Sequence, residues 1–120
     1  MNAEQRLKQA NDAFAKGDFK TAVQAFRDVI KLHPEIGELY INLGAALKSS
    51  GERDAAEQAY RDAIKKIPKS AIAWFNLGNL LRENRQAEEA LKAYRKADKL
   101  QPGTPEILNN LGTQLYDIGA

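Results

Sequence analysis

The sequence predicts an all-α protein built from repeated pairs of antiparallel helices. Pro34, Pro68 and Pro102 lie 34 residues apart, and most of the 120-residue chain aligns on that period. Within each period, apolar residues recur at helical spacing, and a polar turn divides the period into two segments. Because a single helix pair cannot bury both of its faces, we expect neighbouring pairs to stack side by side.

The first segment of each period carries an apolar stripe at positions i, i+3, i+4 and i+7, which is typical of an amphipathic helix. The stripe comprises Tyr40, Leu43, Gly44 and Leu47 in the second period, and Trp74, Leu77, Gly78 and Leu81 in the third. These stripes predict first helices over residues 37–50 and 71–84.

A second helix follows in each period after a short polar turn, such as Ser49, Ser50 and Gly51. The proline that closes the period sets its end, because the residue before a proline is pushed out of the α-helical region. The expected second helices cover residues 53–66 and 87–100.

Small residues recur at one position on each helix of a pair, and close helix packing explains them. They are Gly44 with Ala56 in the second period, and Gly78 with Ala90 in the third. Two helices approach closely only where their contact point lacks bulk. We therefore expect glycine and alanine to meet at the crossing, and the rings of Tyr60 and Tyr94 to fill the wedge away from it.

Residues 105–117 repeat the pattern of a first helix, with Leu108, Leu111, Gly112 and Leu115 in register. No second helix follows before Ala120. Two interpretations stay open, a C-terminal capping helix or an excised fragment of a longer array, and the apolar face favours the fragment. An uncovered apolar face also predicts self-association, as a homodimer through helix 105–117 with contacts from Leu108, Leu111 and Leu115.

The combined pattern resembles the tetratricopeptide repeat (TPR) family. Residues 71–102 match that family's pattern nearly throughout, residues 37–68 match it with Tyr40 in place of tryptophan, and residues 3–34 match it mainly in their second half. The resemblance implies an all-α, right-handed TPR solenoid in a single domain, residues 1–120. Its repeats would be 3–36, 37–70 and 71–104, followed by a partial fourth repeat or capping helix at 105–120.

TPR solenoids line a concave groove with their first helices, and the resemblance implies which residues face it. The candidate peptide-binding residues are Leu7, Asn11, Ile41, Asn42, Phe75, Asn76, Asn79, Arg82 and Asn110. Asn42, Asn76 and Asn110 share one position in successive repeats, so they predict a line of amides matching the C=O and N–H groups of an extended peptide. This ladder is similar to that of the TPR superhelix in O-linked N-acetylglucosamine transferases. The alternative is that asparagine at this position bonds locally.

The chain matches poorly the carboxylate clamp with which some TPR chaperone cofactors grip a C-terminal carboxylate. Asn11 and Asn42 fit that pattern, but Leu7 stands in place of its first lysine. Ile72 and Asn76 stand in place of the third-repeat cations. We therefore do not expect clamp function.

Composition and charge limit the other classes of function. A net charge of +2 is too small to predict nucleic acid as the main partner. No stretch approaches ~18 apolar residues and the N-terminus is rich in charges, so we expect neither membrane insertion nor a signal peptide. With one histidine and no cysteine, transition-metal sites and catalytic triads lack parts. We expect no cofactor, no metal and no enzymatic activity.

These observations favour a cytoplasmic protein–protein interaction module that binds an extended peptide or partner segment in the concave groove. Two alternatives stay open. One is a self-assembling structural scaffold, and the other is the regulatory TPR array of a larger enzyme, truncated at residue 120.

Overall fold

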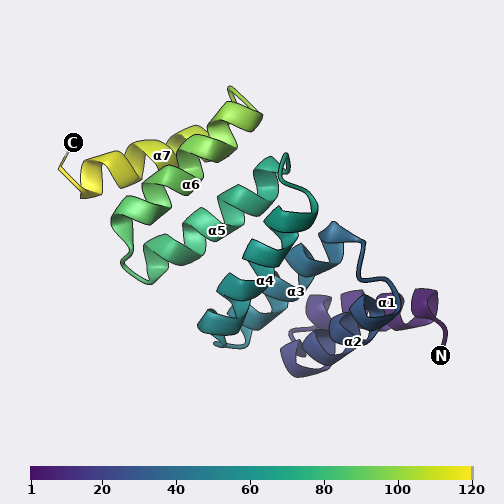
Figure 1. Cartoon of the computed structure of the whole chain (residues 1–120). Helices are drawn as coiled ribbons and strands as arrows, with labels where there is room; N and C mark the ends of the chain where they lie inside the picture. Colours follow the sequence, from purple (N-terminus) through teal and green to yellow (C-terminus); the bar gives the residue numbers. More distant parts are fainter. Residues whose placement is uncertain (120) are drawn as a thin grey trace. The chain divides into compact units, whose positions relative to one another are not determined.

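The computed structural model describes residues 1–119, which form seven α-helices and no strand (Figure 1). The helices are α1 (Ala3–Ala15), α2 (Phe19–Leu32), α3 (Gly37–Ser49), α4 (Arg53–Lys66), α5 (Ala71–Glu83), α6 (Ala87–Leu100) and α7 (Pro105–Asp117). Each of the five helices predicted by range forms, with its ends within one residue of the expected positions. The predicted all-α fold of repeated helix pairs is therefore confirmed.

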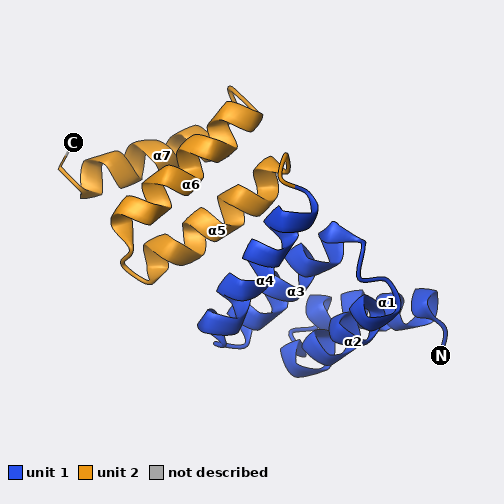
Figure 2. Ribbon diagram, viewed as in Figure 1, with its two compact units in different colours: residues 1–67 blue, residues 68–120 orange. Residues whose placement is uncertain are grey.

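The helices group into two compact units, unit 1 with residues 1–67 and unit 2 with residues 68–120 (Figure 2). Unit 1 holds α1 to α4, and unit 2 holds α5 to α7. Within each unit, every helix packs against the next helix of the chain, as in a helical repeat. The partial repeat predicted at 105–120 ends at Ala120, which lies outside the described residues.

Side chains at the helix N-termini explain where three of the helices begin. Asn2 and Gln5 form a capping box at α1, in which each side-chain oxygen accepts from the backbone N–H of the other residue, at 2.8 and 3.0 Å. Asp18 caps α2 and Ser70 caps α5 through a side-chain oxygen in the same way. These oxygens satisfy N–H groups that the first helical turn leaves without an intrahelical acceptor.

The turn between the two helices of a pair contains one residue with a positive φ. Gly17 and Gly51 supply it in unit 1, with φ of 81° and 86°. Glycine adopts this conformation easily because it has no Cβ. Between α5 and α6 the corresponding residue is Arg85, with φ of 63°. A side chain is strained in that region, so the α5–α6 turn stores strain that the glycine turns avoid.

The core of unit 1 contains one buried ring for each helix pair, Phe26 on α2 and Tyr60 on α4. The Tyr60 ring lies directly against Gly44 of α3, because a Cβ added at Gly44 would approach the ring to 2.5 Å. The expectation that Tyr60 fills a wedge away from the glycine is therefore wrong. The ring is wide enough to occupy the place that the missing side chain leaves, and the glycine is needed for that reason.

Unit 2 repeats this packing and extends it to a third helix. The buried ring of Tyr94 on α6 lies against Gly78 of α5, at 2.8 Å from an added Cβ. The expected wedge position is therefore wrong for Tyr94 as well. A buried cluster of Ala71, Ala97 and Ile107 then joins α5, α6 and α7, and Trp74, Phe75 and Leu100 pack against it with part of their surface exposed.

Candidate functional site

Unit 1 places two of the predicted groove asparagines at one small pocket. Asn11 from α1 and Asn42 from α3 line it together with Phe14, Phe26 and Ala45. The pocket has a volume of about 110 Å³, and both asparagines are exposed. This surface combines two amides with apolar walls, which suits a segment that carries a polar main chain and small apolar side chains.

Leu7 and Ile41, the two aliphatic residues of the predicted site, differ in the surface that they offer. Leu7 on α1 is half-buried. Ile41 on α3 is only 8% exposed, although its repeat position predicts a side chain in the groove. Burial has already removed the isoleucine from water, so contact with a partner would bury little further apolar area. Ile41 therefore belongs to the core.

Unit 2 brings polar side chains from three helices to one oxygen atom. The Oδ1 atom of Asn79 on α5 accepts a hydrogen bond from the Tyr94 hydroxyl on α6 at 2.5 Å. It also accepts one from Nδ2 of Asn110 on α7 at 2.8 Å. A carboxamide oxygen has two lone pairs, so these two donors fill its acceptor capacity. Asn110 therefore bonds to an asparagine of the preceding repeat, 31 residues earlier in the chain.

Tyr94 is held as a neutral hydrogen-bond donor. Burial raises the pKa of the Tyr94 hydroxyl above its ordinary value of 10.0, and the nearby Arg82 and Asn110 side chains partly offset this effect. The Tyr94 ring also packs at a tilt against Phe75, with ring centroids 6.0 Å apart. The hydroxyl therefore keeps its proton at neutral pH and directs it at Asn79.

The other predicted residues of α5 lie near this cluster. Phe75, Asn79 and Arg82 follow one another at i, i+4 and i+7, so they share one face of the helix. Phe75 and Asn76 are half-buried, whereas Arg82 is exposed. This face of α5 therefore carries an aromatic ring, two amides and one cation.

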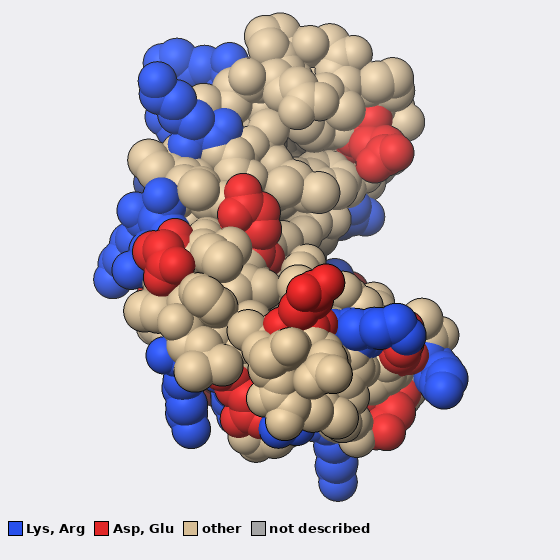
Figure 3. Space-filling model, turned by 90° about the vertical axis from the view of Figure 1, so that its right-hand side faces the viewer, with Lys and Arg blue, Asp and Glu red and all other residues tan. Residues whose placement is uncertain are grey.

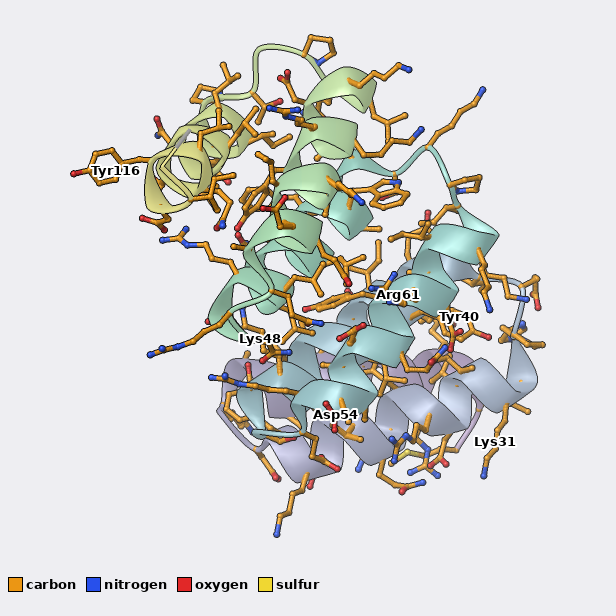
Figure 4. The ribbon with its side chains drawn as sticks, turned by 60° about the vertical axis from the view of Figure 1, so that its left-hand side comes forward. Lys31, Tyr40, Lys48, Asp54, Arg61 and Tyr116 are labelled. Atoms are coloured by element: carbon orange, nitrogen blue, oxygen red, sulfur yellow. The ribbon has the colours of Figure 1, made fainter. Side chains whose placement is uncertain are left out.

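The last helix, α7, exposes an apolar face. Leu108 is 46% exposed and Tyr116 is 84% exposed, while Leu111 and Leu115 are half-buried. Figure 4 shows Tyr116 projecting away from its helix into solvent. These side chains include all three residues that the sequence predicts for self-association.

Gly112 distinguishes α7 from the first helices of the two preceding repeats. Gly44 and Gly78 occupy the same repeat position, and each receives a tyrosine ring. At Gly112, an added Cβ would meet nothing within 4 Å. The missing side chain of Gly112 therefore leaves a notch in the surface of α7, and no described residue fills this notch.

Charged side chains of both signs occur on the molecular face drawn in Figure 3. Oppositely charged side chains pair along the helices at i, i+4, as Arg61 does with Glu57 at 3.0 Å and Lys8 with Asp12 at 3.3 Å. Within residues 1–119, no helix combines the length and hydrophobicity needed to cross a membrane. The same residues contain no group of three His, Cys, Asp or Glu side chains placed to hold a metal ion.

Sequence pattern alone predicts Tyr94 as an aromatic filler and does not predict the contact of its hydroxyl with Asn79. A signal was present. A buried tyrosine hydroxyl needs a hydrogen-bond partner, whereas the phenylalanine at the same position in the first repeat, Phe26, needs none. Tyrosine at this position therefore indicates a polar side chain close to the ring.

The helix pairs, the turns and the ring-on-glycine packing define an α-helical repeat protein. The family model of the tetratricopeptide repeat matches residues 7–49 and 43–105 of the chain. Since these matches cover well over half of the sequence, the chain belongs to the TPR family. Comparison with curated protein sequences found no match.

Solved structures of TPR domains share this fold at low sequence identity. The first TPR of Spaghetti (RPAP3), bound to an HSP90 peptide, has a TM-score of 0.92 and 20% identity, covering 98% of this chain and 94% of that chain. The TPR2B domain of yeast Sti1, in a complex with pHsp70, has a TM-score of 0.90 and 23% identity, covering 96% and 97%. The Yersinia enterocolitica chaperone SycD, in complex with a peptide of the translocator YopD, has a TM-score of 0.88 and 20% identity, covering 96% and 93%. At these identities the likeness establishes the fold.

Proposed function

We propose that the chain is a protein–protein interaction module, which binds an extended peptide or partner segment against its first helices. The observation that carries this proposal is the pairing of Asn79 with Asn110, whose amides lie together on a surface that also includes Phe75 and Arg82. In unit 1, the pocket lined by Asn11 and Asn42 offers a similar combination of amides and apolar surface.

The structural relatives support the same function. RPAP3 is bound to an HSP90 peptide, and SycD is bound to a peptide of YopD. Some TPR co-chaperones grip a terminal carboxylate with cationic side chains at fixed repeat positions. In this sequence, two of those positions hold Leu7 and Ile72. The partner of this chain is therefore proposed to be held through its main chain and apolar side chains rather than through a terminal carboxylate.

The proposal includes a ladder formed by Asn42, Asn76 and Asn110. This ladder would be similar to the asparagine ladder of the TPR superhelix in O-linked N-acetylglucosamine transferases. Each net hydrogen bond contributes ~0.5–1.5 kcal/mol, so three contribute ~1.5–4.5 kcal/mol. A micromolar complex needs about 8 kcal/mol. Apolar contacts, such as those with the partly exposed Leu7 and Phe75, must supply the remainder.

The test is a double replacement, Asn42→Ala with Asn76→Ala, in the full chain. A peptide selected on the chain from a random library should bind about 5- to 150-fold more weakly, because two hydrogen bonds are lost. The melting temperature should not change. Gln24→Ala on the exposed surface of α2 is the control and should keep wild-type affinity. Unchanged affinity of the double variant would rule out the ladder.

We propose self-association through α7 as a second function, with a second copy of the chain as the partner. The specific observation is the open notch at Gly112 beside the exposed Leu108 and Tyr116. Leu111 and Leu115 would add partly exposed apolar area. Light scattering across a dilution series should show a dimer that Leu108→Lys abolishes. A wild-type chain that stays monomeric at the highest concentration would exclude this function.

We place the chain in the cytoplasm as one TPR domain with repeats 3–36, 37–70 and 71–104, with protein rather than nucleic acid as its partner and without catalytic activity of its own. The alternative role, as the regulatory array of a larger enzyme, is tested by the reading frame beyond Ala120. A catalytic domain encoded there would favour that alternative.

A further inference from the structure

Helix α7 carries an unfilled notch and an exposed aromatic ring one helical turn apart. A Cβ added at Gly112 would meet no described atom within 4 Å, although Gly44 and Gly78 at the same repeat position each receive a tyrosine ring. The ring of Tyr116 is 84% exposed and projects into solvent (Figure 4). Because the space beside Gly112 is open, Tyr116 does not fold back over the glycine of its own helix.

The notch and the ring belong to one apolar face of α7. Residues three and four apart are neighbours on a helix, so Gly112 and Tyr116 lie together with Leu111 and Leu115. The opposite side of α7 packs against α6, where Ile107 is buried (Figure 1). The apolar face is therefore available to a partner, while α6 holds the helix in place.

We propose that Tyr116 of one copy of the chain fills the notch at Gly112 of a second copy, in a two-fold symmetric dimer of antiparallel α7 helices. This inference rests on the proposed self-association and names the contact that specifies it. In a two-fold interface each copy gives a ring and receives one. The chain already makes this contact between the antiparallel helices of a pair, at Gly44 with Tyr60 and at Gly78 with Tyr94.

One register of the two helices satisfies both the leucines and the ring. With Leu111 level with the partner's Leu115 along the antiparallel helices, Tyr116 is level with the partner's Asn110. Helical side chains lean toward the N-terminus of their own helix, which is the C-terminal direction of an antiparallel partner. The ring of Tyr116 therefore reaches over the partner's Gly112, where the missing side chain leaves room.

The charges of α7 favour this antiparallel arrangement over a parallel one. Its only charged residues are the acidic Glu106 and Asp117. In a parallel two-fold pair each acid would be level with the same acid of the partner, and like charges repel. In the antiparallel register Asp117 is level with the partner's Asn109, whose amide can donate to a carboxylate. Leu108 is level with the partner's half-buried Ile118 and extends the apolar contact.

The size of the contact makes the ring and the notch decisive. Helix α7 has 13 residues and is about 20 Å long. A contact of this length belongs to the small, weak interfaces below ~1,200 Å². In such an interface a few well-packed anchors carry most of the binding energy, and tyrosine is a frequent anchor. Loss of the ring or of the notch should therefore dissociate the dimer.

The first test is sedimentation velocity of the full chain across a dilution series. Gly112→Ala should weaken the dimer about 10-fold or more, because the added Cβ occupies the place of the partner's ring. The monomer should stay folded, since this Cβ meets open space in its own chain, and circular dichroism checks this. Thr113→Ala, at an exposed position outside the apolar face, is the control and should dimerise like wild type. Wild-type dimerisation of Gly112→Ala would overturn the proposal.

The second test separates the ring from the hydroxyl and from general stickiness. Tyr116→Ala should weaken the dimer about 10-fold or more, whereas Tyr116→Phe keeps the ring and should stay within about twofold of wild type. A mixture of Gly112→Ala with Tyr116→Ala restores one contact, because the first variant supplies the ring and the second supplies the notch. Mixed dimers should form at concentrations at which each variant alone is monomeric.

The outcomes distinguish this inference from the self-association on which it rests. If the wild-type chain dimerises but the mixture associates no better than its separate variants, the ring and the notch do not meet. The inference then fails while self-association through α7 stands. If the wild-type chain stays monomeric at the highest concentration, both fail.

Discussion

The ring of Tyr94 occupies the space beside Gly78 in which any other residue would place its side chain. A Cβ at Gly78 would lie 2.8 Å from both Cδ1 and Cε1 of this ring. The ring is fully buried, so it cannot move aside without disturbing the core of unit 2. This contact links the glycine of a first helix to the tyrosine of its partner helix, and it recurs at Gly44 and Tyr60.

Gly78→Ala should destabilise the protein by about 1–3 kcal/mol, because the added methyl group overpacks the core. Gly112→Ala is the matched control on α7, where the added Cβ meets open space. There the loss of a helical glycine should stabilise by about 0.5–1 kcal/mol. Urea unfolding of both variants measures the difference, and equal effects would show that the ring does not constrain Gly78.

Arg85→Gly should stabilise the protein by about 0.5–1 kcal/mol. A side chain held at φ of 63° costs about 1–2 kcal/mol, and the replacement removes this cost. Part of the gain in folding free energy is lost because glycine has greater conformational freedom in the unfolded chain. Thermal unfolding measures the change. Gly51→Ala, at φ of 86° in the α3–α4 turn, is the reverse experiment and should destabilise. A lower melting temperature for Arg85→Gly would contradict the assignment of strain.

Gln114→Leu should raise the stability of the protein by about 1 kcal/mol. Gln114 is 2% exposed, its Oε1 has no hydrogen-bond partner, and its Nε2 makes one long bond of 3.3 Å to the Ala87 carbonyl. Removing a buried, unsatisfied acceptor gains more than that bond loses. The same repeat position on α5 holds the buried Leu80. Differential scanning calorimetry checks the shift, with the exposed Gln58→Leu as a control that should change little.

Tyr94 should make stability fall at alkaline pH. Its pKa is higher in the folded protein than the ordinary 10.0, because burial disfavours the phenolate. The folded state therefore holds the proton more tightly than the unfolded state. The contribution of Tyr94 to the free energy of unfolding is complete below pH 10 and is lost as pH rises through the pKa of the folded state. Denaturant midpoints above pH 10 should decline less steeply in Tyr94→Phe than in wild type. Equal slopes would show that Tyr94 does not titrate with unfolding.

Much of the fold could be predicted because repetition in the sequence reports which faces of the helices are buried. The proline spacing placed the ends of α4 and α6, and the apolar stripes placed α3, α5 and α7 within one residue. The repeat positions of the candidate-site asparagines select one side of each first helix. Their role in binding a partner stays a prediction.

Contacts between atoms of different helices required the tertiary structure. Sequence periodicity placed the Tyr94 ring in a wedge away from the helix crossing, and only the packed helices show the ring against Gly78 and the hydroxyl against Asn79. The burial of Ile41 and Gln114 was likewise decided by neighbouring side chains. The sequence alone therefore determined the boundaries of α3 to α7, because the 34-residue period and helical geometry repeat them. Hydrogen bonds and close packing depend on shifts of less than an ångström between helices, and only the three-dimensional arrangement decided them.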